Sequence, residues 1–253
     1  MQILLTSHKA QRMKKAIYHI FLMLIASFLT PQVAQAKVLL VAVGIGDYPK
    51  PINKLNLPTK DAIAIQKLID KNGDSGTAIL LDQQATKSAI LSEIHARFDH
   101  ASTDDIIIFF FSGHGYKGGF VAYDGELPYS LIREAMGSSK CKNKMIFADA
   151  CFSGKMRQGK RQVKEENSDS NVMLFLSSRD NETSIERRDM TNGFFTICLK
   201  DGLSGKADAD RDRTITAKEI FNYVSNNVKK LSRDKQHPVM WGNFSNTMPV
   251  IRW

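Results

Sequence analysis

A histidine and a cysteine, each at the end of an apolar segment, are the residues best suited to covalent chemistry. His114 follows "FFFSG", and Cys151 follows "MIFADA". A thiolate can attack a carbonyl carbon, and an imidazole within reach can take the thiol proton and return it to the leaving group. Flanking glycines allow close backbone approach, so the N–H groups of Gly115 and Cys151 could stabilise an oxyanion. The alternative is a buried structural thiol beside an incidental loop histidine.

Asp149 precedes this cysteine by two positions, in the stretch "ADACFSG". A negative charge there disfavours the thiolate, so it does not activate Cys151. Residues two apart on a strand point to the same side, which predicts that both side chains face one cleft. A carboxylate in that cleft can hold the cation of a substrate Arg or Lys. The alternative is a structural carboxylate that accepts backbone N–H bonds.

The elements that must position these residues alternate along the chain. Short apolar runs predict strands, and apolar residues repeating every three or four positions predict helices between them. The runs are "VLLVAVG", "TAILL", "DIIIFFFSG", "KMIFAD" and "NVMLFLSS"; the helical segments are "DAIAIQKLIDK", "SAILSEIHARF", "PYSLIREAMG", "GFFTICLKDGL" and "AKEIFNYVSNNVKKL". This order predicts an α/β domain with a parallel sheet covered on both faces. Ligands of such sheets bind at the carboxyl ends of the strands, just past which we expect His114 and Cys151.

The motifs "SGHG" and "DACFSG" resemble the two signature motifs of the caspase/metacaspase superfamily. From about Val38 to the C-terminus, "VAVGIGDYP", "LNLPTKDA" and "LSSRDNETSIE" followed by "NGFFT" also resemble bacterial members. The resemblance implies a three-layer α/β/α caspase–haemoglobinase fold with a mainly parallel central sheet. It implies a cysteine endopeptidase with Cys151 as nucleophile, His114 as general acid/base and the N–H of Gly115 in the oxyanion hole. Phe152 departs from the histidine usual in eukaryotic metacaspases, without touching the dyad.

The resemblance also implies a pocket for a basic substrate residue. In metacaspases an aspartate matching Asp149 lines this pocket, helped by a second aspartate, for which "LPTKDA" offers Asp61. Lys60 stands where the family often has asparagine. Caspases proper bind aspartate through arginine, and the Asp61 position carries none. Asp61 could instead be an acid favoured by the dipole of its helix.

These observations predict an exported caspase-like endopeptidase that cleaves protein or peptide substrates after Arg or Lys and requires no cofactor. Two alternatives stay open: a catalytically silent, calcium-dependent binding module on a caspase scaffold, and a cysteine transpeptidase. The intact His114 and Cys151 disfavour the binding module. The sequence does not separate hydrolysis from transfer, because both use one acyl-enzyme.

The first 36 residues have the three parts of a secretory signal. A basic "MKK" at Met13–Lys15 precedes the apolar "AIYHIFLMLIASFL", and "AQA" ends the segment at Ala36. Met13 would make a better start, with Met1–Arg12 as an upstream extension. The apolar run is shorter than the roughly 20 residues that span a bilayer, so we expect no membrane span after signal removal. The peptidase domain would be residues 37–253, in the periplasm or secreted.

Charge and cysteine content add two constraints. The net charge of +9 includes four basic residues from positions 1–36, and no stripe of basic and aromatic residues indicates nucleic-acid binding. Three cysteines leave at least one unpaired, and a pairing of Cys141 with Cys198 is left open.

The polar segment 155–171, "KMRQGKRQVKEENSDSN", directly follows the cysteine motif. Its composition predicts a flexible loop. Related enzymes mature by cutting such a linker, which makes self-cleavage a hypothesis here. The candidate cleavage residues are Lys155, Arg157, Lys160, Arg161 and Lys164.

A second motif, "DADRDRTITAKE" at positions 208–219, nearly matches an EF-hand calcium loop. The matching positions are Asp208, Asp210, Asp212, Thr214 and Glu219. Arg213 replaces the usual glycine at position 6, where a left-handed backbone costs a non-glycine residue about 1–2 kcal/mol. The rival interpretation is a capping box, in which Thr216 and Glu219 begin the last helix.

Overall fold

The computed structural model describes residues 15, 36–71, 75–151, 171–178 and 190–253. The chain forms two units, Met1–Gln35 and Ala36–Trp253, and the second is described below. The predicted signal segment, apart from Lys15 and Ala36, and the cleavage residues of the 155–171 loop lie outside the described residues. Among the helices that are described, none is long and apolar enough to cross a membrane.

A mainly parallel sheet forms the middle of the domain. Its order is β2-β1-β3-β6-β7-β9, with every pair parallel except the last. These strands are β1 (Val38–Gly44), β2 (Ser75–Leu81), β3 (Ile106–Tyr116), β6 (Asn143–Cys151), β7 (Val172–Leu176) and β9 (Val239–Trp241). A hairpin of β4 (Gly119–Ala122) and β5 (Gly125–Pro128) extends the end of β3, and β8 (Thr214–Thr216) pairs with β10 (Pro249–Arg252).

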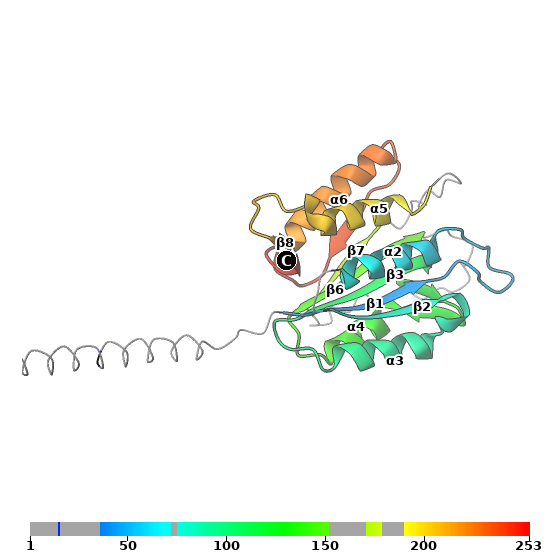
Figure 1. Cartoon of the computed structure of the whole chain (residues 1–253). Coiled ribbons are helices and arrows are strands. Elements are labelled where there is room, and N and C mark those ends of the chain that lie inside the picture. Colours follow the sequence, from blue (N-terminus) through cyan, green and yellow to red (C-terminus); the bar gives the residue numbers. More distant parts are fainter. Residues whose placement is uncertain (1–14, 16–35, 72–74, 152–170, 179–189) are drawn as a thin grey trace, which may run out of the picture. The chain divides into compact units, whose positions relative to one another are not determined.

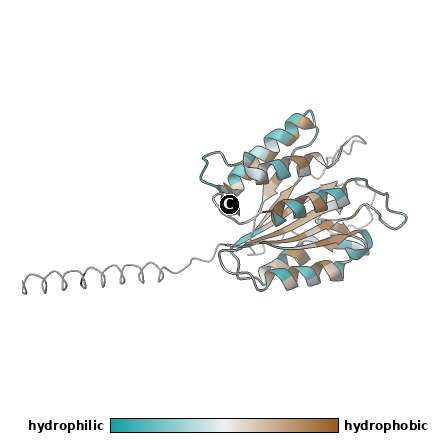
Figure 2. Ribbon diagram, viewed as in Figure 1, coloured by the Kyte–Doolittle hydropathy of each residue, from teal (hydrophilic) through white to brown (hydrophobic). Residues whose placement is uncertain are grey.

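Helices cover both faces of this sheet and complete three layers (Figure 1). One face packs against α3 (Lys87–Phe98) and α4 (Tyr129–Gly137). The other packs against α2 (Pro58–Asp70), α5 (Phe194–Asp201) and α6 (Ala217–Leu231). A π-helical turn, Gly202–Lys206, follows α5, and a short 3-10 turn, Asp82–Gln84, precedes α3. Figure 2 shows apolar strands between helices that are polar on their outer sides.

Local sequence signals explain where the helices begin. Pro58 stands in the first turn of α2, Thr86 caps α3 through its hydroxyl, and Thr216 and Glu219 form a capping box at α6. The apolar periodicity also points inward as predicted, since Ile90, Ile94 and Phe98 of α3 are fully buried. The three-layer α/β/α prediction is confirmed.

The strand limits required a correction. We expected His114 and Cys151 just past their strands, but β3 continues to Tyr116 and β6 ends at Cys151 itself. The reason is tertiary: beyond Gly113 the backbone of β3 still pairs with β6, and Gly115 then pairs with Phe120 of β4. The short strands β4, β5, β8, β9 and β10 escaped the sequence analysis because such brief segments carry little periodicity.

Candidate active site

His114 and Cys151 occupy paired positions on two neighbouring strands. In the parallel register of β3 and β6, His114 is the Cα partner of Cys151, and Ser112 is the partner of Asp149. All four positions lie at the carboxyl ends of their strands. Side chains alternate along a strand, and Phe110 and Phe147 belong to the core under α2, α5 and α6. The positions Ser112, His114, Asp149 and Cys151 therefore belong to that same face.

The imidazole of His114 is held by the loop between β1 and α2. Its Nε2 lies 2.8 Å from the backbone carbonyl oxygen of Asn53. A carbonyl can only accept, so Nε2 carries the proton and Nδ1 is the unprotonated nitrogen of the neutral ring. The ring also packs against Tyr48, with centroids 4.9 Å apart. This arrangement leaves the basic nitrogen of His114 available for proton transfer.

Two aspartates meet beneath these strand ends. Asp61, in the first turn of α2, is 1% exposed and accepts hydrogen bonds from the Ser112 hydroxyl at 2.8 Å and the Asn192 amide at 2.9 Å. Asp149 is 8% exposed and accepts the N–H and hydroxyl of Thr196 at 3.1 and 2.9 Å. Asp61 also accepts the N–H of Gly193, which ties both carboxylates to the start of α5.

The pair has an unusual electrostatic state. The pKa of Asp61 is raised from 3.8 to about 8, first by burial and then by the negative charge of Asp149, against the opposing effect of the bonds from Asn192, Ser112 and Gly193. Near neutral pH, Asp61 thus retains a proton that an exposed aspartate would lose. A cation between the two carboxylates would lower the pKa of Asp61 and release this proton.

The contacts of the two aspartates bear on the structural alternatives expected for them. Asp149 does accept a backbone N–H, as the structural alternative required, through Oδ2 and the Thr196 amide. Asp61 lies at its helix N-terminus, yet its oxygens bind Ser112, Asn192 and Gly193 rather than N–H groups of α2. The resemblance implied that the two carboxylates share one pocket; their burial and their hydrogen bonds come from the structure alone.

A model of the caspase domain, a family of peptidases, matches residues 37–248. The chain belongs to the caspase-domain family. The match spans all of the central sheet, from β1 to β9. Family membership supports a cysteine peptidase acting on proteins, in agreement with the sequence analysis.

The caspase domain also resembles a solved structure, that of protein GSU0716 from Geobacter sulfurreducens. The TM-score is 0.61 at 16% identity, over 81% of this chain and 92% of the other. At that identity the likeness concerns the fold alone. No curated protein matches the sequence.

The caspase domain keeps its other two cysteines apart. Cys141 and Cys198 are both free and buried, and they pack in the two cores on opposite faces of the sheet. A bond between them is therefore excluded. Burial raises the pKa of both thiols, to about 12 for Cys198, so neither is a reactive thiolate near neutral pH.

The calcium-like loop brings three carboxylates together. One oxygen from each of Asp208, Asp210 and Asp212 lies within 4.8 Å of the others. Arg213 has a φ of 67°, the left-handed backbone expected at position 6. Thr214 begins β8, and Glu219 bonds to Thr216 and to the N–H of Ala209. The capping box is thus present, and calcium binding stays a prediction.

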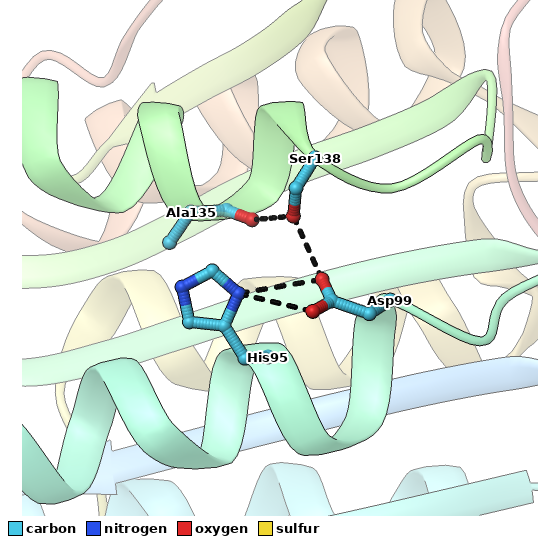
Figure 3. Close-up of polar contacts among 4 residues, drawn as sticks. All are labelled: His95, Asp99, Ala135 and Ser138. Carbon is cyan, nitrogen blue, oxygen red and sulfur yellow. Dashed lines mark hydrogen bonds and ion pairs between the residues drawn. The ribbon is translucent and has the colours of Figure 1, made fainter.

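A serine, a histidine and an aspartate also meet on the α3–α4 side, without forming a catalytic triad (Figure 3). The Ser138 hydroxyl donates to Asp99 at 2.7 Å and lies 2.8 Å from the carbonyl oxygen of Ala135. Nδ1 of His95 contacts the same Asp99 carboxylate. Because the hydroxyl bonds to the carboxylate and not to the imidazole, His95 cannot act as its base. The cluster joins the ends of two helices.

Five residues of the site were not singled out from sequence. They are Tyr48, Asn53, Ser112, Asn192 and Thr196. The only local signal of Tyr48, Ser112, Asn192 and Thr196 is their presence within "VAVGIGDYP", "SGHG" and "NGFFT", and Asn53 lies in none of these motifs. Each acts through a partner at least 47 residues away, which a local pattern does not encode.

Proposed function

We propose that this protein is an exported cysteine endopeptidase that cleaves after Arg or Lys through a His114/Cys151 dyad. The observation that carries the proposal is the β3–β6 register, in which these two residues are direct partners at the carboxyl ends of their strands. Adjacent parallel strands are about 4.8 Å apart, close enough for a thiol and an imidazole to exchange a proton.

In the proposed reaction, Nδ1 of His114 takes the thiol proton and the Cys151 thiolate attacks the scissile carbonyl carbon. The N–H of Gly115 would stabilise the oxyanion. The imidazolium then gives its proton to the departing amine, leaving an acyl-enzyme. Water, deprotonated by His114, attacks the thioester carbonyl, and the thiol is regenerated.

The buried carboxylates support a preference for basic residues. Asp149 shares a strand face with Cys151, and Asp61 lies near enough for the charge of Asp149 to raise its pKa. A guanidinium or ammonium group at this place would pair with the charge of Asp149 and favour loss of the Asp61 proton. A substrate aspartate would instead place a second negative charge beside that of Asp149, which is unfavourable.

The test is a panel of fluorogenic peptides with Arg, Lys, Asp or Leu before the cleaved bond. The purified protein is compared with Cys151→Ala and His114→Ala, each with calcium and with chelator. We expect turnover of the Arg and Lys peptides by the wild type and a loss of at least about 100-fold in either variant. Turnover of the Asp peptide in preference would contradict the basic pocket, and no turnover of any peptide would favour the binding module.

A further inference from the structure

We propose that Tyr48 is a positioning residue that holds the backbone and ring of His114 in place for catalysis. The inference rests on the proposed dyad and adds to it a residue outside both signature motifs. Tyr48 lies in the loop after β1 and is 3% exposed.

The hydroxyl of Tyr48 replaces a missing strand. Strand β1 pairs with β3 only as far as Gly44 and Ser112, and Ile45 then donates to the Ser112 carbonyl at 3.0 Å. The next N–H on that side of β3 belongs to His114, at the point where the β1 pairing has ended. Tyr48 Oη accepts this N–H at 3.0 Å. A partly buried amide that would otherwise lack a β1 partner is thereby satisfied.

The hydroxyl is itself fixed by a second strand. Tyr48 Oη donates its single proton to the carbonyl oxygen of Val121 in β4, at 2.8 Å. Its lone pairs must then serve His114. Since β4 is the strand that pairs with the end of β3, the hydroxyl joins the backbone of β3 at His114 to that of β4 at Val121.

The same loop controls the imidazole. The phenol ring of Tyr48 lies against the His114 ring at a centroid distance of 4.9 Å, and Asn53 accepts the Nε2 proton. Asp82 anchors the loop by accepting the N–H groups of Gly46 and Asp47 at 2.8 and 2.9 Å. One loop therefore fixes the backbone, the ring plane and the tautomer of His114. Within this loop, Tyr48 makes the main contact with the histidine.

The hydroxyl of Tyr48 also lies close against Gly113. A Cβ atom added at Gly113 would lie 2.6 Å from Tyr48 Oη, well inside contact distance. The glycine before the histidine is therefore required by the close approach of Tyr48. Gly113→Ala would displace the hydroxyl without changing the tyrosine.

The test compares Tyr48→Phe, which removes only the hydroxyl, with Tyr48→Leu, which also removes the ring. Tyr129→Phe is the matched control, because Tyr129 is a second tyrosine whose ring packs on Phe120 in the same core. We expect kcat to fall about tenfold in Tyr48→Phe and about 100-fold in Tyr48→Leu, with KM changed less than about twofold. The control keeps the wild-type kcat.

A second readout does not need peptide cleavage. The rate of Cys151 alkylation by iodoacetamide is measured against pH, with the labelled peptide identified by mass, in these variants and in Gly113→Ala and His114→Ala. Cys141 and Cys198 are buried with raised pKa values, so they label slowly. We expect His114→Ala to move the profile to higher pH, and Tyr48→Phe and Gly113→Ala to move it in the same direction.

The outcomes separate the two proposals. A wild-type profile and kcat in Tyr48→Phe, with a displaced profile in His114→Ala, would overturn the role of Tyr48 and leave the dyad intact. An unchanged profile in His114→Ala would overturn the dyad and, with it, this inference. Equal losses in Tyr129→Phe and Tyr48→Phe would show that the effect is general destabilisation and also overturn the role of Tyr48.

Discussion

Asp61 and Asp149 approach each other from helix α2 and strand β6, and the charge of Asp149 helps to raise the pKa of Asp61 to about 8. The two are 88 positions apart in sequence. They meet because α2 lies on the face of the sheet that carries the odd-numbered positions 149 and 151 of β6. Negative charge therefore lies beside the proposed nucleophile. Residues at the start of α5 form hydrogen bonds with both carboxylates.

We predict that Asp149→Asn weakens the preference for Arg over Leu peptides by about tenfold or more. The amide retains an oxygen acceptor for Thr196 while removing the charge that attracts the substrate cation. The preference is measured by peptide kinetics. The control is the pH profile of Cys151 alkylation, which should stay unchanged or move to lower pH. An unchanged ratio of kcat/KM values between Arg and Leu peptides would contradict the pocket.

The raised pKa of Asp61 predicts a specific pH dependence of stability. In the unfolded chain Asp61 loses its proton near 3.8, whereas in the folded protein it does so at about 8. Between these values the folded state binds more protons, so the free energy of unfolding falls as pH rises. Asp61→Asn removes this titration, and its melting temperature should decline less between pH 4 and pH 8 than that of the wild type. If the melting temperatures of the variant and the wild type declined equally between pH 4 and pH 8, that result would count against the coupled pair.

Gly193→Ala is predicted to disturb the acidic site through packing alone. A Cβ atom at Gly193 would overlap the Asp149 carboxylate, which would have to leave its bonds with Thr196. We expect a loss of about 1–3 kcal/mol in the free energy of unfolding. Gly76→Ala is the control, because there the Cβ atom meets only the mobile end of Leu39. Denaturant unfolding of both variants tests the difference, and equal losses would refute it.

Calcium is predicted to raise the melting temperature of the protein relative to chelator, since a ligand that binds only the folded state stabilises it. Asp210→Asn should reduce the shift, because its carboxylate is one of the three that lie together. Glu219 is a poor choice of variant, since its removal would also break the capping box of α6. Identical melting with calcium and with chelator would remove the calcium prediction.

Self-cleavage in the 155–171 loop is predicted to depend on Cys151. The wild-type protein should yield two fragments cut after a basic residue, and Cys151→Ala should stay intact, as measured by mass spectrometry. A variant with all five basic residues replaced should not be cut, while its peptide turnover stays measurable. Its substitutions are Lys155→Gln, Arg157→Gln, Lys160→Gln, Arg161→Gln and Lys164→Gln. Intact wild-type protein after prolonged incubation would speak against autoprocessing.

Much of the fold could be predicted because its elements are locally encoded. The apolar runs of β1, β3, β6 and β7 and the periodic apolar residues of α2 and α3 mark strands and helices without reference to the rest of the chain. The motif residues His114 and Cys151 were recognised for the same reason. The strand ends were missed where pairing with a distant strand extends them, as β6 and β4 do for β3.

The sequence by itself determined the residue types available for catalysis, the alternation of strands and helices, and the face on which Asp149 and Cys151 both lie. Only the tertiary structure decided that His114 is the register partner of Cys151, that Asp61 and Asp149 are both buried and bonded to the start of α5, and that Tyr48 replaces strand β1 beside the histidine. The physical reason is the sequence separation of the interacting residues. Periodicity and capping depend on neighbours within a few positions, whereas strand order, register and buried hydrogen bonds depend on which distant segments close over a common core.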